Sequence, residues 1–169
     1  FKNDFHNIIL DNYSFIQKVL HHLILGNKFL NKSLYELEKI FFKSKKNFED
    51  NEHIFITGLP RSGTTALLNF LYESGEFASL TFADMPFVMS PNLYNLIKKK
   101  KNKRIFERFH NDRVFYTTDS PEALDEIFFK VFKNERNNSI IFKNLIGFIL
   151  DRYDKTKYFS KNNKNYNRL

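Results

Sequence analysis

The chain has 169 residues, with 27 lysines and arginines against 19 acidic residues, and it contains no cysteine. This length suits one domain with a real core, and 42% hydrophobic with 17% aromatic residues indicates a folded chain rather than a disordered one. The lack of cysteine excludes disulfides, thiolate catalysis and cysteine metal sites, and it fits a reducing compartment such as the cytoplasm. No apolar stretch reaches the roughly 18–20 residues that span a bilayer, and no signal peptide is visible.

The formal charge of +8 has two interpretations. Lysine, asparagine, isoleucine and phenylalanine dominate the composition, as an AT-rich coding sequence would give. A basic surface also attracts polyanions, although no recognised nucleic-acid-binding module is present. A non-catalytic polyanion-binding domain therefore remains one alternative for the function.

The N-terminal third has helical periodicity. Apolar residues recur at close to helical spacing over residues 5–25, and Asn27 with the glycine before it predicts the end of that helix. A second helix follows, with Ser33 beginning a capping-box pattern in or at its start. We expect residues 1–50 to form a helical lead-in that packs against a nucleotide-binding core formed by residues 51–169.

The most informative segment is HIFITGLPRSGTT at residues 53–65. An apolar run, a glycine-rich loop and a helical pattern follow one another here. That order predicts a strand, a tight anion-cradling loop, and a helix whose first N–H groups and positive dipole end face the loop. The spacing fits the phosphate-loop template G-x-x-x-x-G-K-[ST] at Gly58, Gly63 and Thr65, but Thr64 occupies the lysine position.

The missing lysine limits the class of ligand. ATP and GTP enzymes place that lysine on the β- and γ-phosphates and the next hydroxyl on magnesium. In this chain the cation stands within the loop instead, as Arg61. The pattern therefore indicates an anion with less charge than a triphosphate–magnesium cluster, while a nucleotide kinase or NTPase relative remains an alternative.

Predicted helices and strands alternate through the rest of the chain. Strands separated by helices predict an α/β fold, a P-loop-like parallel sheet flanked by helices, with function at the strand ends. In the helix after the loop we expect a buried face of Leu67, Leu68, Phe70 and Leu71. The predicted elements are a helix over 65–74, a strand over 78–82, a helix from Pro91 to about 101, a helix starting at 119–122, a helix over 139–153 and a strand over 157–161.

The loop RSGTT resembles, residue for residue, the [KR]-S-G-T-T loop of the sulfotransferase superfamily. In that family the loop follows the first strand of a P-loop-like fold and binds the 5′-phosphosulfate of 3′-phosphoadenosine 5′-phosphosulfate (PAPS). The Pro-Arg form is similar to the bacterial and tyrosylprotein branches, whereas the cytosolic branch favours lysine and a following tryptophan. The resemblance implies that the chain is a transferase that moves a sulfuryl group from PAPS to a hydroxyl or amine acceptor, without a metal. The residues that it assigns to PAPS binding are Arg61, Ser62, Gly63, Thr64, Thr65 and Ala66.

Three predicted strand ends carry groups that suit this chemistry, namely Arg61, Asp84 and Lys161. In the tyrosylprotein branch a carboxylate just past the second strand acts as base, and a lysine at a later strand end helps stabilise the transition state. The resemblance gives these roles to Asp84 and Lys161. The cytosolic branch uses a histidine as base, which makes His110 the rival. We expect Asp84 and Lys161 to face the loop across a shared cleft, with His110 farther away.

One family element has no counterpart before Leu169. Sulfotransferases hold the 3′-phosphate of the cofactor with an arginine and a serine near an R-D-P segment. The resemblance therefore covers residues 53–165, and it implies that the chain is the N-terminal part of a longer PAPS-binding domain. The acceptor and the oligomeric state have no signal in the sequence.

Overall fold

The computed structural model describes residues 23–24, 26–42, 51–59, 62–97, 105–107, 115–117, 119–122 and 124–162. These residues form an α/β architecture with five α-helices, one short 3₁₀ helix, a three-stranded parallel sheet and a separate two-stranded antiparallel pair. The predicted α/β class is therefore confirmed. No helix in the described part of the chain combines the length and the apolar character needed to cross a membrane.

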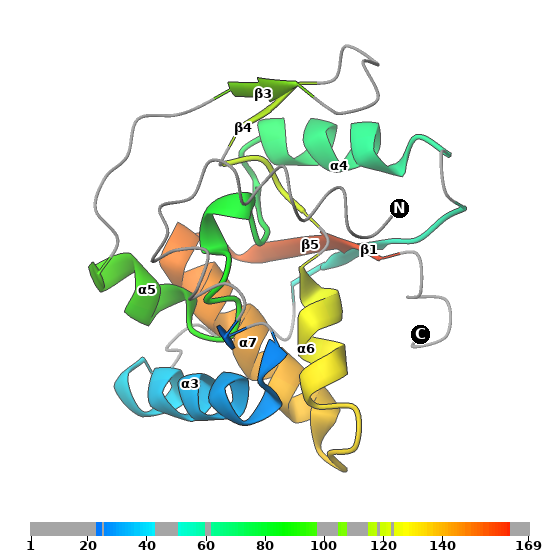
Figure 1. The fold of residues 1–169 in the computed structure, drawn as a ribbon. Helices are drawn as coiled ribbons and strands as arrows, with labels where there is room; N and C mark the ends of the chain where they lie inside the picture. Colours follow the sequence, from blue (N-terminus) through cyan, green and yellow to red (C-terminus); the bar gives the residue numbers. More distant parts are fainter. Residues whose placement is uncertain are drawn as a thin grey trace.

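The sheet has the strand order β1–β5–β2, with both pairings parallel. β5 (Lys157–Lys161) is central, β1 (Ile54–Ile56) lies on one side, and β2 (Phe77–Ala78) lies on the other. Figure 1 shows helix α4 (Thr64–Glu73) over one face of this sheet and helix α7 (Asn138–Tyr153) over the opposite face. In the register of β1 and β5, Ile56 lies beside Lys161, so the carboxyl ends of both strands meet at the same edge.

The side chains of β5 alternate between the two faces, as the pleat of a strand requires. Phe159 is fully buried in a small cluster with Ile56 and with Leu68 of α4. Its neighbour Tyr158 belongs instead to the larger core beneath α7. The same alternation directs Lys161, two residues after Phe159, to the α4 side, where the phosphate-loop pattern lies.

The described part of the predicted lead-in consists of helical residues 23, 24 and 26 followed by helix α3 (Lys28–Phe41), while residues 1–22 lie outside the described part of the chain. Asn27 begins this helix, because its side chain accepts hydrogen bonds from the amides of Phe29 at 3.0 Å and Leu30 at 3.2 Å. Ile24 and Gly26 are helical and Asn27 is not, so the prediction that the first helix ends at Gly26 and Asn27 is confirmed, and Asn27 also begins α3. The prediction that Ser33 opens a capping box was wrong, because Ser33 lies inside α3. An asparagine side-chain oxygen can accept from the free N–H groups at a helix start, and Asn27 rather than Ser33 has this role in α3. Tyr35 anchors α3 in the larger core, edge-on to Phe132 at 5.3 Å.

Helix α4 has nearly the predicted bounds, and Gly75 follows it with a positive φ of 71°. Its predicted buried face was right at two of four positions, since Leu71 packs against the same cluster as Leu68. Leu68 is buried, but Leu67 and Phe70 are 48% and 70% exposed. The helix lies on a sheet of only three short strands, so a single stripe of its surface has something to pack against.

The segment between β2 and α7 departs most from the predicted elements. The predicted strand over 78–82 ends early, and Phe82–Asp84 forms the 3₁₀ helix η1. α5 (Pro91–Ile97) begins at Pro91 as predicted. α6 (Asp125–Val131) starts later than 119–122, because Pro121 forms an antiparallel bridge with Thr81.

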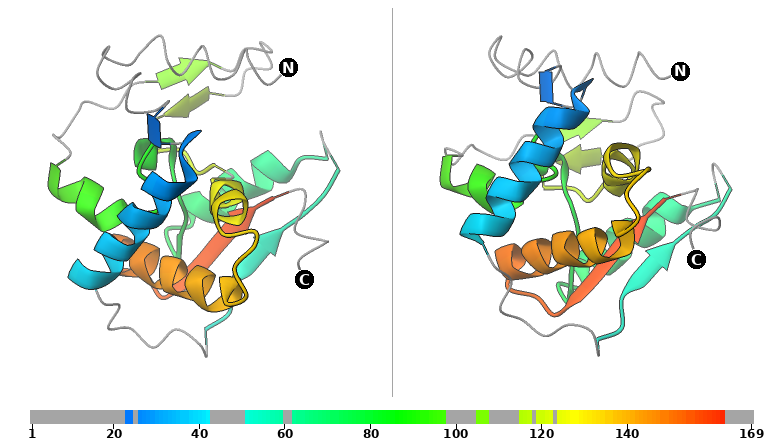
Figure 2. Two further views of the ribbon diagram at one scale, coloured as in Figure 1. Left: turned by 60° about the horizontal axis from the view of Figure 1, so that its bottom comes forward. Right: turned by 90° about the horizontal axis from the view of Figure 1, so that it is seen from below.

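The antiparallel pair of β3 (Ile105–Glu107) and β4 (Phe115–Thr117) was not predicted. Each strand has three residues, which is too short for a period-two pattern to be recognisable. α7 and β5, by contrast, match the predicted ranges to within one residue. Both views of Figure 2 show β3 and β4 apart from the parallel sheet.

Candidate anion-binding loop and the buried carboxylate network

The candidate site begins where β1 passes into α4 through residues 57–63. Gly63 is the residue before α4 and has a φ of +79°, a left-handed conformation that glycine adopts without steric cost. The hydrogen-bond ladder of α4 starts with the amide of Leu67, which donates to the carbonyl of Gly63 at 3.1 Å. Among the described residues, no side chain caps this helix start. The positive end of the α4 dipole is thus directed at the loop, and Gly63 lies at the turn where the phosphate-loop pattern puts it.

Gly58 allows the loop to close on itself. A β-carbon at this position would lie 2.8 Å from both Ser62 Oγ and Thr64 Cγ2, closer than such atoms approach in proteins. The amide of Ser62 donates to the carbonyl of Leu59 at 3.2 Å, which closes a tight turn inside the loop. The turn itself therefore uses the amide of Ser62. The first N–H groups of a helix have no acceptor within its own hydrogen-bond ladder, so the amides at the start of α4 are the donors that an anion at this loop could use.

Lys161 reaches the same loop from the neighbouring strand. Its ammonium group donates to the hydroxyl of Thr65, in the first turn of α4, at 2.7 Å. The two residues are far apart in sequence, and the parallel register of β1 and β5 brings them together. Lys161 therefore places a cation beside the start of α4, although position 64 holds threonine.

On the other face of β5 the buried hydroxyl of Ser160 donates to Asp125 at 2.9 Å, which ties the start of α6 to the same strand end.

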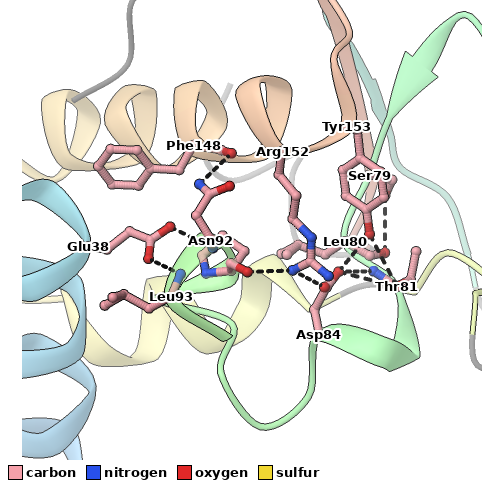
Figure 3. A network of polar contacts seen from close by, with 11 residues as sticks. Glu38, Ser79, Leu80, Thr81, Asp84, Asn92, Leu93, Phe148, Arg152 and Tyr153 are labelled. Atoms are coloured by element: carbon pink, nitrogen blue, oxygen red, sulfur yellow. Dashed lines mark hydrogen bonds and ion pairs between the residues drawn. The ribbon is translucent and has the colours of Figure 1, made fainter. Parts of the chain in front are cut away.

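Asp84 lies in a different environment. It is the last residue of η1 and is fully buried. Its Oδ2 accepts hydrogen bonds from the amide of Thr81 at 2.8 Å, the hydroxyl of Thr81 at 3.2 Å and the hydroxyl of Tyr153 at 3.1 Å. Its Oδ1 forms an ion pair with Arg152 at 2.5 Å. Figure 3 shows all three partners turned toward this carboxylate.

This environment corrects the assignment of Asp84 as general base. A base must reach the acceptor proton directly or through one water, and each oxygen of Asp84 already has a buried partner. Arg152 and Tyr153 belong to the last turn of α7, which leads into the amino end of β5, whereas Lys161 ends that strand. Lys161 thus contacts the loop, whereas the partners of Asp84 lie near the opposite end of β5 and hold it in a structural role. The capping box of η1 turns the carboxylate inward.

The buried network continues from Arg152 to α5 and α3 (Figure 3). Arg152 also donates to the carbonyl of Pro91 at 2.9 Å. The carboxylate of Glu38 on α3 accepts the first amides of α5, from Asn92 at 2.8 Å and Leu93 at 3.0 Å. Burial raises the pKa of Glu38 above its usual range, although these hydrogen bonds and Arg152 oppose the shift. Burial beside Asp84 likewise raises the pKa of Tyr153.

Sequence reasoning missed this network. One signal was available for Glu38, which shares the buried stripe of α3 with Asn31 and Tyr35 at helical spacing. A carboxylate on such a stripe requires buried donors. Arg152 carried no comparable signal, because a basic residue in the last turn of a helix is usual at the surface.

The remaining predicted residues divide into two groups. Thr64 is half-buried against Gly58, and Ala66 is exposed on α4. Arg61 and His110 lie outside the described part of the chain, so their roles stay predictions. Within the residues that the structure describes, no group of three potential metal ligands comes together.

Comparisons with known proteins identify no relative of the chain. No family model matches the chain, and neither a curated protein nor a solved structure matches it. The function is therefore argued from the loop and its surroundings alone.

Proposed function

We propose that the chain binds PAPS at the loop between β1 and α4 and takes part in transferring its sulfuryl group to a hydroxyl or amine acceptor. The observation that carries this proposal is the 2.7 Å contact from Lys161 to Thr65, at a loop framed by Gly58 and Gly63. It supports the proposal because it supplies the positive charge that the threonine at position 64 leaves out. That charge comes from the end of the adjacent parallel strand.

The donors available at this loop suit a sulfate or phosphate ester. Helix N-termini bind such anions through backbone N–H groups and the helix dipole, and a lysine adds a point charge. Because glycine has no β-carbon, the loop backbone at Gly58 can lie close to Ser62 and to Thr64 at the start of α4. PAPS would supply an activated sulfuryl group. The donors of this chain would hold that end of PAPS and neutralise charge that develops on its oxygens.

Within this proposal Lys161 acts by electrostatic stabilisation, and Arg61 is predicted to add a second cation. Removing one donor of this kind costs on the order of 10²–10³ in turnover. Asp84 has no catalytic part, because its carboxylate is enclosed by Arg152, Thr81 and Tyr153. His110 stays the predicted candidate for the base.

The test compares two nucleotides in a thermal-shift assay. Adenosine 3′,5′-bisphosphate should stabilise the chain more than ATP with magnesium does, because the loop lacks the lysine that holds a triphosphate. A ligand present at a hundred times its Kd adds about 2.7 kcal/mol of stability. Lys161→Met should weaken bisphosphate binding about 10- to 100-fold, the value of one charge-assisted hydrogen bond. Lys157→Met is the matched control, since Lys157 lies at the other end of β5 and faces Glu76 at 4.0 Å. Preference for ATP with magnesium, or equal loss in both variants, would contradict the proposal.

A further inference from the structure

A cavity of about 470 Å³ lies between α3 and the first half of α7. Residues 134–137, which connect α6 to α7, complete its lining. Its volume falls within the range of small-molecule sites, about 300–1,000 Å³. None of its lining residues belongs to the loop between β1 and α4, so this cavity is separate from the candidate PAPS site.

Four charged side chains line this cavity, and three of them already have a partner. Lys39 pairs with Glu36 at 3.5 Å, and Glu135 pairs with Lys32. Arg136 forms neither a hydrogen bond nor an ion pair with another described residue. Its guanidinium group can therefore take a ligand, and its fork of N–H donors matches a carboxylate in a bidentate geometry.

The two carboxylates of the lining limit the negative charge that a ligand can carry. Glu36 belongs to α3 and Glu135 to the connection between α6 and α7, so they approach the cavity from two different elements. A second carboxylate or a phosphate on the ligand would be repelled by these groups. The lining therefore favours a monoanion, whereas the start of α4 favours a phosphate or sulfate ester.

The neutral polar groups of the lining suit a ligand with several hydroxyls. The side chains of Asn134, Asn137 and Asn144 line the cavity together with Tyr35. The amide nitrogen of Asn144 donates to the hydroxyl of Tyr35 at 3.2 Å, which leaves the amide oxygen of Asn144 as an acceptor. A side-chain amide offers both donors and an acceptor, and a hydroxyl of a ligand can use both because it donates and accepts.

We propose that this cavity binds a polyhydroxy monocarboxylate, the chemical class of the sugar acids. Arg136 holds the carboxylate, and the asparagine amides hold the hydroxyls. A neutral sugar would leave the charge of Arg136 unmatched, and a nucleotide would bring several negative charges beside Glu36 and Glu135. This binding function does not depend on the proposed binding of PAPS, because the two sites share no residue.

The test uses three probes that share one hydroxylated six-carbon chain. Sorbitol has no carboxylate, gluconate has one, and glucarate has one at each end. In amide-resolved NMR titrations of the full chain, gluconate should bind at least about tenfold more tightly than either of the others, the value of one charge-assisted hydrogen bond. The shifts should fall on residues 134–137 and on Asn144.

Two variants separate the role of Arg136 from general attraction to a basic chain. Arg136→Met should lower the affinity for gluconate to that for sorbitol, and Arg136→Lys should recover part of it, because lysine restores the charge without the fork. Lys133→Met is the matched control, since Lys133 is an exposed cation of the same connection that does not line the cavity. It should leave the affinity for gluconate within about twofold, because solvent and salt screen exposed charges.

Four results would overturn the proposal. Gluconate may show no saturable binding, or glucarate may bind as tightly as gluconate, which is the behaviour of a basic surface without a defined site. Equal losses in Arg136→Met and Lys133→Met would lead to the same conclusion. Competition between gluconate and adenosine 3′,5′-bisphosphate would assign gluconate to the loop between β1 and α4 instead. Circular dichroism melts show whether each variant keeps the fold, and Arg136→Gln replaces Arg136→Met if that variant does not.

Discussion

Replacing Asp84 by asparagine tests the structural role that the fold gives to this carboxylate. The substitution keeps the shape of the side chain but removes its charge, which leaves Arg152 without its ion-pair partner although its side chain is only 7% exposed. It also turns an amide group toward one of the donors that now point at Asp84. Removing one partner of a buried ion pair costs about 3–5 kcal/mol of unfolding free energy. Asp84→Asn should therefore cost an amount in this range.

The measurement is urea denaturation followed by circular dichroism. Glu73→Gln is the matched control, because Glu73 is exposed at the end of α4 and such changes shift stability by no more than about 0.5 kcal/mol. Combining Asp84→Asn with Arg152→Met should recover part of the loss, since both charges are then absent. If Asp84→Asn costs less than about 1 kcal/mol, the carboxylate does not hold η1 to α7 and its catalytic assignment must be reconsidered.

Three further substitutions test other parts of the account. Gly58→Ala should weaken binding of adenosine 3′,5′-bisphosphate at least tenfold in calorimetry, because the added carbon displaces Ser62 or Thr64, and unchanged affinity would refute the close loop packing. Asn27→Ala should lower the unfolding free energy by about 1 kcal/mol in urea titrations, the value of a helix cap, and no loss would remove that role. Glu38→Gln should become less stable relative to wild type as pH falls toward 4.5. Because the pKa of Glu38 is raised in the folded state, its contribution to stability is fully present below pH 4.5 and is lost as pH rises through the raised pKa. A stability advantage of wild type over Glu38→Gln that grows with rising pH would contradict this reasoning.

The parts of the fold that were predictable from sequence have strong local signals. β5 is a compact run of aromatic and polar residues bounded by turns, and α7 has sixteen residues with apolar positions throughout its length. The turns at Gly63 and Gly75 were predictable because glycine is the residue that adopts the positive φ found at both positions. At these positions local propensity and tertiary structure agree, so the sequence alone was sufficient.

The start of α6 was not predictable because a tertiary contact decides it. Residues 119–122 have the composition of a helix start, but Pro121 pairs with Thr81 and the amide of Glu122 donates to the carbonyl of Leu80. The chain therefore stays extended there, and the helix begins only at Asp125. Local propensity is a weak prior that such pairing overrides.

The candidate site divides in the same way. The loop and Lys161 were predictable, because a glycine pattern and the end of a strand are both local signals. The surroundings of Asp84 were not, since Arg152 lies far along the chain and only packing places it beside η1. A carboxylate after a strand has the same local sequence whether it faces a cleft or caps a turn. The 3₁₀ turn that buries Asp84 separates these two outcomes.

The most direct test of the central claim is an amide-resolved NMR titration with adenosine 3′,5′-bisphosphate. If the loop between β1 and α4 binds this anion, the largest shifts should fall on the amides of Gly63, Thr64 and Thr65, with Lys161 following the same binding curve. Lys161→Met should weaken that curve, and Lys157→Met should leave it unchanged. Shifts confined to other surfaces, or stronger binding of ATP with magnesium at the same loop, would contradict the claim.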